Sequence, residues 1–104
     1  MKLFYKEFCL GKLDYVNDKY VYNSLEGEKL ALAKYSAMIE YNLENSHNLK
    51  SEKIFPFFKT KFLDQIFERK DILEKIGTKS VNDFEILEKF CKLNFDKFGY
   101  YLSN

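Results

Sequence analysis

The sequence has few of the residues that catalytic and metal-binding sites most often use. Its 104 residues include one histidine, two cysteines and four isolated glycines, so no phosphate-binding glycine loop is present. His47 lies in the polar stretch ENSHNLK with no cysteine or second histidine nearby, which makes it a poor zinc ligand. We therefore expect that the chain is not an enzyme and that it has no catalytic residues, no metal site and no cofactor.

The two cysteines form no redox or metal-binding motif. Cys9 and Cys91 are far apart and make no C-x-x-C pair, so we expect two free, buried thiols. Lys2, Lys6 and Glu7 interrupt the first residues, which therefore lack the apolar segment of a signal peptide. No apolar run approaches the roughly 20 residues that cross a bilayer. These features predict a cytoplasmic protein that makes no membrane contact.

An excess of one charge sign is also missing. The chain has 17 Lys and Arg residues against 16 Asp and Glu, a formal net charge of +1. The two signs alternate along the chain, for example in Glu68-Arg69-Lys70-Asp71. Proteins that bind nucleic acid through its phosphates usually have a basic excess. The composition therefore predicts a mixed, solvated surface and no direct nucleic-acid contact.

Aromatic residues, in contrast, are abundant. Eleven Phe and eight Tyr contribute to a hydrophobic share of 46%, which is enough to build a core. A chain of this length buries roughly two-thirds of its unfolded surface, so we expect a single domain over residues 1–104. Some of the rings should remain at the surface, where large apolar side chains usually mark an interface.

The first quarter of the chain has the alternation of β-strands. Apolar and polar residues alternate over residues 2–9, with a slip of register near Phe8-Cys9, and over residues 11–16 and 19–23. Asn17-Asp18 separates the last two ranges and tolerates the left-handed backbone of a tight turn. We expect these residues to form an antiparallel meander of three strands.

Three shorter segments follow the meander. Residues 28–34 are rich in helix formers and predict about two helical turns. From Tyr35 to Leu43 apolar and polar residues alternate again, which predicts a half-buried strand. Residues 44–50 are the most polar stretch, and we expect an exposed loop there.

The second half of the chain has helical periodicity. Ser51 is the expected N-cap of a first helix, in which Pro56 is tolerated only within the first turn or so. A second helical stretch ends at Gly77, and periodicity does not decide whether the two are joined at Asp64-Gln65. Ser80-Val81-Asn82-Asp83 has the form of a capping box before a third helix.

A short final strand completes the predicted fold. Residues 100–102, which follow Gly99, could return to the opening sheet. The sequence therefore predicts an α+β fold, in which a small antiparallel sheet from the N-terminal meander packs against two or three C-terminal helices.

Several segments together resemble the N-terminal subdomain of HipA-type Ser/Thr kinases. Residues 51–58, SEKIFPFF, resemble the family's "s-x-x-v-F-x-F-F" helix. Gly11-Lys12-Leu13 and Tyr20-Val21-Tyr22 resemble its second and third strands, and Tyr35-Ser36-Ala37-Met38 resembles the strand that follows. The resemblance covers nearly the whole chain. The chain lacks the proline of the family's turn after the aromatic helix, where it has Phe62-Leu63-Asp64-Gln65.

The resemblance implies a function in protein binding. The family's subdomain also occurs as a separate antitoxin-like protein, HipS, and the kinase's catalytic lobe is absent from this chain. We therefore expect a non-catalytic regulatory module that binds and inhibits a HipA-type kinase in trans, alone or together with a helix-turn-helix repressor. The candidate contact residues around the aromatic helix are Phe57, Phe62, Phe67 and Arg69.

Alternatives remain for both the residues and the function. Any one of these phenylalanines could belong to the core, and Arg69 could form a structural ion pair. A fold does not determine its target. A phage or mobile-element inhibitor of a host defence nuclease, similar in role to an anti-CRISPR protein, is therefore the alternative function.

Overall fold

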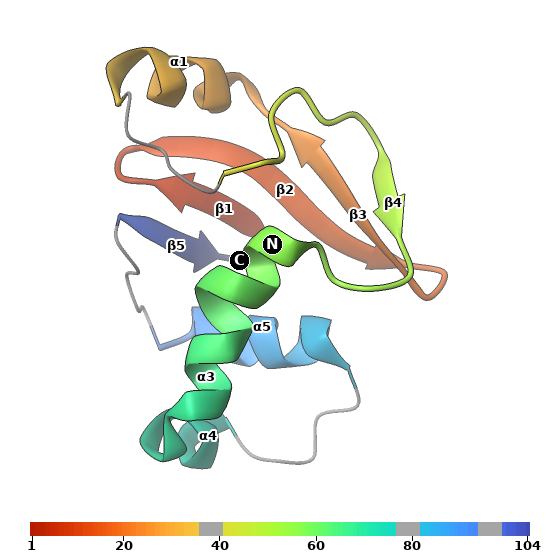
Figure 1. Cartoon of the computed structure of the whole chain (residues 1–104), viewed down its shortest axis with the longest axis vertical. Coiled ribbons are helices and arrows are strands. Elements are labelled where there is room, and N and C mark those ends of the chain that lie inside the picture. The colour runs from red at the N-terminus through yellow and green to blue at the C-terminus, as the bar shows by residue number, and fades with distance from the viewer. Residues whose placement is uncertain (36–40, 77–81, 94–98) are drawn as a thin grey trace.

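The computed structural model describes residues 1–35, 41–76, 82–93 and 99–104, and its fold is α+β as the sequence predicted. A five-stranded antiparallel sheet has the strand order β4-β3-β2-β1-β5 (Figure 1). The strands are β1 (Lys2–Tyr5), β2 (Phe8–Val16), β3 (Lys19–Ser24), β4 (Leu49–Ser51) and β5 (Tyr100–Ser103). The predicted meander is therefore the centre of a wider sheet.

Each of the two turns of the meander contains at least one residue with a left-handed backbone. Asn17 and Asp18 have φ angles of 52° and 60°, the conformation of a tight hairpin turn, so this predicted turn is confirmed. The first turn is at Lys6-Glu7, where Lys6 has a φ of 51°. The expected break before Gly11 was wrong, because Gly11 lies within β2, opposite Leu3 and Ser24.

Helix α1 (Glu26–Lys34) follows β3 and packs closely on β2. It begins two residues before the predicted range. A Cβ atom added to Gly27 would lie 2.2 Å from the carbonyl oxygen of Cys9. Glycine is therefore required at this position by the close approach of helix and strand.

The segment after α1 differs from the prediction. Tyr35 is the C-cap of α1, residues 36–40 lie outside the described residues, and residues 41–43 are in no strand. Leu49–Ser51 forms the edge strand β4, opposite Tyr22 to Tyr20 of β3, although residues 44–50 were expected to be a loop. Only three residues of β4 pair with β3, and a strand this short has no alternation that would reveal it in the sequence.

One helical run extends from Pro56 to Glu68. It consists of α2 (Pro56–Phe58), the π-helical turn η1 (Lys59–Leu63) and α3 (Asp64–Glu68), so the chain is continuous at Asp64-Gln65. Pro56 occupies the first helical position, as expected. The predicted N-cap was wrong: Ser51 ends β4, and its Oγ accepts a hydrogen bond from the Lys53 amide at 3.2 Å.

Two further helices precede the last strand. Helix α4 (Lys70–Ile76) follows a break at Arg69, and α5 (Asp83–Cys91) is capped by Asn82, whose side chain accepts from the Glu85 amide at 2.9 Å. Asn82 rather than the expected Ser80 is the cap, and Ser80 lies outside the described residues. Strand β5 pairs with β1, so the predicted return to the opening sheet is confirmed.

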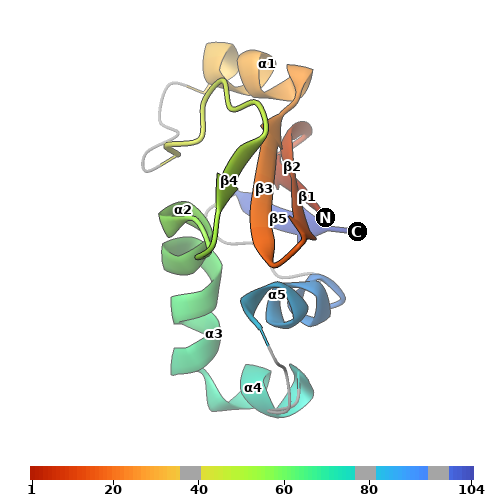
Figure 2. The same cartoon turned by 90° about the vertical axis from the view of Figure 1, so that its right-hand side faces the viewer.

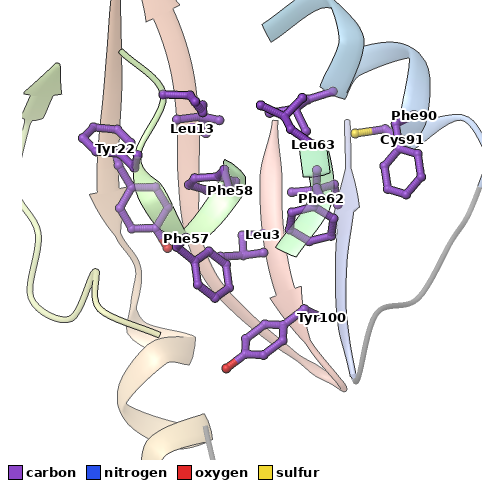
Figure 3. Close-up of a cluster of buried hydrophobic side chains, with 14 of the residues drawn as sticks. Leu3, Leu13, Tyr22, Phe57, Phe58, Phe62, Leu63, Phe90, Cys91 and Tyr100 are labelled. Atoms are coloured by element: carbon purple, nitrogen blue, oxygen red, sulfur yellow. The ribbon is translucent and has the colours of Figure 1, made fainter. Parts of the chain in front are cut away.

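In Figure 2, α2 and α3 lie on one side of the sheet, α1 and α5 lie above and below it, and none of the described helices covers the opposite side. The core lies between the sheet and these helices, and Figure 3 shows some of its side chains, including Leu3, Leu13, Phe58 and Phe90. Among the described helices, none combines the length and apolarity that crossing a membrane requires.

Both cysteines are free thiols. Cys9 is half-buried, Cys91 is buried, and burial raises the pKa of the Cys91 thiol to about 11. The thiol of Cys91 is therefore protonated at neutral pH, and it packs as a small apolar side chain.

We expect Gly27→Ala to destabilise the protein, although alanine is the better helix former. The added Cβ would have to displace the backbone of Cys9, and such overpacking costs roughly 1–3 kcal/mol. Urea unfolding would measure the loss, with the exposed Lys29→Ala on the same helix as the control. An unchanged or higher free energy of unfolding for Gly27→Ala would contradict this packing.

Candidate functional site

The aromatic residues of the long helical run divide into a buried set and one exposed ring. Phe57 is 3% exposed and Phe62 is 0% exposed, so both of these candidate contact residues belong to the core. The Phe57 ring packs 5.1 Å from the Tyr100 ring, and the Phe62 ring packs 6.1 Å from that of Phe90 (Figure 3). These side chains attach the helical run to β5 and α5, and they are not available to a partner in this structure.

The π-helical turn explains why so many neighbouring residues face inward. Phe58, Phe62, Leu63 and Ile66 are all at most 2% exposed. A π-helix has i→i+5 hydrogen bonds, which widen the turn and bring Leu63 beneath the same face as Phe58. The widened turn thus fixes which side of α3 is buried and which side faces solvent.

Phe67 is the aromatic residue that this arrangement leaves outside. Its side chain is 52% exposed, while the preceding Ile66 is fully buried. Phe67 lies in the last turn of α3. In Figure 1, α3 leads into α4 at the end of the molecule farthest from α1. A large apolar side chain exposed next to a well-packed core is a typical anchor for a partner.

Arg69 forms the corner between α3 and α4. Its backbone leaves the helical region, with φ −114° and ψ 105°, and its guanidinium donates two hydrogen bonds to the Asp71 carboxylate, at 3.2 and 2.7 Å. These hydrogen bonds from Arg69 hold the pKa of the Asp71 carboxyl below its ordinary value. We call Phe67, Arg69 and Asp71 the α3–α4 corner. The structure thus brings together two of the four candidate contact residues, Phe67 and Arg69.

The open side of the sheet is a second surface with functional potential. We call its outward side chains the open face: Lys2 and Phe4 of β1, Lys12, Asp14 and Val16 of β2, Lys19, Val21 and Asn23 of β3, Lys50 of β4, and Tyr101 and Ser103 of β5. Val21 is only 9% exposed, but it lies outside the core cluster because its side chain points to the open side of the sheet. The sequence analysis missed this surface, because its residues come together only through the strand register.

A buried carboxylate was also missed. Glu28 of α1 is 1% exposed and accepts hydrogen bonds from Ser24 Oγ at 2.7 Å, from the Asn45 amide at 2.9 Å and from the Tyr41 hydroxyl. Burial, together with the nearby Tyr22 hydroxyl, raises the pKa of Tyr41 above its ordinary value. The carboxylate is thus satisfied by three donors that tie residues 41–46 to α1 and β3, and this network is structural.

Metal ligands are not gathered in the part of the chain that the structure describes. No group of three His, Cys, Asp or Glu side chains there could hold a metal ion. His47 is exposed in the segment before β4. The two surfaces that stand out are therefore the α3–α4 corner and the open face.

Comparison with models of protein families, with curated proteins and with solved structures finds no match. The resemblance to the HipA N-terminal subdomain therefore remains a prediction that depends on the segments quoted from the sequence.

We expect the ion pair at the corner to be visible by NMR as a low Asp71 pKa. Its folded-state pKa is depressed, so the favourable interaction exists above the ordinary value of 3.8 and is lost as the pH falls through the lower folded value. Carboxyl chemical shifts in Arg69→Gln should titrate nearer 3.8. The adjacent Lys70→Gln is the control and should leave the Asp71 pKa low.

We expect Glu28→Gln to destabilise the fold, although it replaces only one carboxylate oxygen with an NH2 group. The hydroxyls of Ser24 and Tyr41 can accept from the new NH2 group, but an uncharged amide forms weaker hydrogen bonds than a carboxylate, so the loss should be about 1 kcal/mol. Urea unfolding should show this loss, whereas Glu26→Gln, at an exposed position of the same helix, should be close to neutral. Equal stability of the two variants would show that the network does not stabilise the fold.

Proposed function

We propose that the chain is a non-catalytic module that binds another protein through the α3–α4 corner. The observation that carries this proposal is Phe67, which is 52% exposed at the end of a helical run whose other phenylalanines are buried. Burying such a ring in a partner stabilises a complex through apolar area at a low cost in side-chain entropy. Arg69 and Asp71 lie beside it and supply charges that favour one orientation of the partner.

The partner that we propose is a HipA-type Ser/Thr kinase. The support is the resemblance of residues 51–58 and of the strand segments to the N-terminal subdomain of those kinases. In the proposed complex, the α3–α4 corner docks on the kinase body and blocks its nucleotide or substrate site. Inhibition then requires no chemistry from this chain, only occupation of the site.

The geometry of the corner suits this mode of binding. The break at Arg69 turns the chain, so α3 and α4 present a protruding angle rather than a flat helix (Figure 2). The buried Phe62 and Ile66 fix α3 to the core, which keeps Phe67 in place before binding. A preorganised anchor loses little conformational freedom on association.

The test is binding to a purified HipA-type kinase, measured by calorimetry and by autophosphorylation. Phe67→Ser should weaken binding by about 30-fold or more, as expected for a buried aromatic anchor. Leu30→Ser is the matched control, because Leu30 is 54% exposed on α1 at the other end of the molecule. It should bind like the unmodified chain.

Three results would contradict parts of this proposal. Equal weakening by both variants would exclude the α3–α4 corner as the specific contact. Inhibition of a defence nuclease without any effect on the kinase would retain the protein-binding function but replace the proposed target. Turnover of a substrate by the chain alone would contradict the non-catalytic assignment.

A further inference from the structure

The charges of the open face differ from those of the chain as a whole. The five charged side chains of this face are four lysines and one aspartate: Lys2, Lys12, Lys19, Lys50 and Asp14. The whole chain has 17 basic and 16 acidic residues, so folding concentrates positive charge on the side of the sheet that no described helix covers. A face of this kind attracts negatively charged groups.

Two of the lysines are placed where they repel each other. Lys2 of β1 and Lys12 of β2 are directly opposite in the register, and like charges in such cross-strand pairs are destabilising. Within the described part of the chain, neither lysine has an ion pair with a carboxylate. A bound anion would remove this repulsion, so the pair favours binding.

A shallow hollow of about 540 Å³ lies at the β4 side of the open face. It is lined by Asp14, Val16, Asn17, Lys19, Val21, Asn23, Asn48 and Lys50. Its three asparagine side chains carry both donors and acceptors, which suit the N–H and C=O groups of an extended backbone. The apolar floor formed by Val16 and Val21 would accept a side chain of the same segment.

The observations favour an acidic protein segment over a single strand of nucleic acid. Asp14 lies in the hollow, where it can accept a hydrogen bond from a backbone amide of a protein segment, a donor that the sugar-phosphate backbone of a nucleic acid lacks. Phe4 and Tyr101 stack on each other, with centroids 5.0 Å apart and planes within 4°. Each ring thus covers one face of the other, and fewer ring faces remain for stacking with bases.

We propose that the open face binds an extended, acidic segment of a partner protein, with carboxylates placed at Lys2, Lys12, Lys19 and Lys50. Adjacent strands are about 4.8 Å apart, so β1 and β4 are separated by about 14 Å. At about 3.3 Å per residue, a segment of roughly five residues crosses this distance. The open face and the α3–α4 corner are different surfaces, so this binding does not depend on the proposed kinase contact.

The test is an NMR titration of the labelled protein with a glutamate-rich peptide of about eight residues, long enough to cross the sheet. The amide signals of β1 to β4 should shift, and the affinity should fall as the salt concentration rises. A thymidine oligonucleotide of similar length is the second probe. It should bind more weakly than the peptide.

Two double variants with the same net charge distinguish binding at the open face from attraction to the overall charge of the protein. Lys2→Glu combined with Lys12→Glu should weaken peptide binding at least tenfold, while it keeps a like-charge pair in the sheet. Lys29→Glu combined with Lys70→Glu, both at exposed positions outside the open face, should have little effect. Lys12→Gln alone should weaken binding and raise the free energy of unfolding, because it removes the repulsion.

Several outcomes would overturn the proposal. Signal changes confined to the helices would place the binding site outside the open face. Equal losses of peptide affinity in the two double variants would show that binding depends on the net charge of the protein and not on this face. Tighter binding of the oligonucleotide than of the peptide would replace the acidic segment with a nucleic acid as the ligand of this face. No binding of either probe at low salt would show that the open face does not bind extended anions.

Discussion

The fold depends on the packing of three phenylalanines from one helical run against the aromatic residues of the sheet and of α5. Phe57 contacts Tyr100, Phe58 contacts Tyr22, and Phe62 contacts Phe90, at centroid distances between 5.1 and 6.1 Å. Edge-to-face and tilted pairs of this kind add stability beyond their buried area. These contacts join the helical run to β3 near the start of the chain and to α5 and β5 near its end. They therefore determine where both candidate surfaces lie. Without them, α3 would have no fixed orientation and Phe67 no fixed position.

Much of the fold could be predicted from the sequence because its patterns are local. Alternation identified the meander, and Asn17-Asp18 identified its second turn. The edge strand β4 could not be predicted, since three residues in backbone pairing leave no periodicity. The N-cap at Ser51 was wrong because Ser51 is used at the end of β4, a non-local contact that outweighs its capping preference.

The candidate site was only partly predictable for a related reason. The sequence shows which residues are aromatic, but only the contacts of the helical run show which of them are buried. Phe58, Phe62 and Ile66 follow i, i+4 spacing, and this spacing could have placed Phe62 in the core and Phe67 off that face. The open face had no comparable signal. Its lysines come from four different strands, and the balanced charge of the whole chain gives no sign that they lie on the same side of the sheet.

The pairing of β1 with β5 has a consequence for how the chain is made. Lys2 lies opposite Ser103, so the sheet joins residues that are synthesised about 100 positions apart. The meander can form as soon as it leaves the ribosome, but β1 keeps one edge unpaired until β5 has also emerged. During that interval the exposed backbone of β1 can pair with other strands, including those of a second nascent copy. Slow translation of the last segment would therefore favour misassembly more than slow translation of the first.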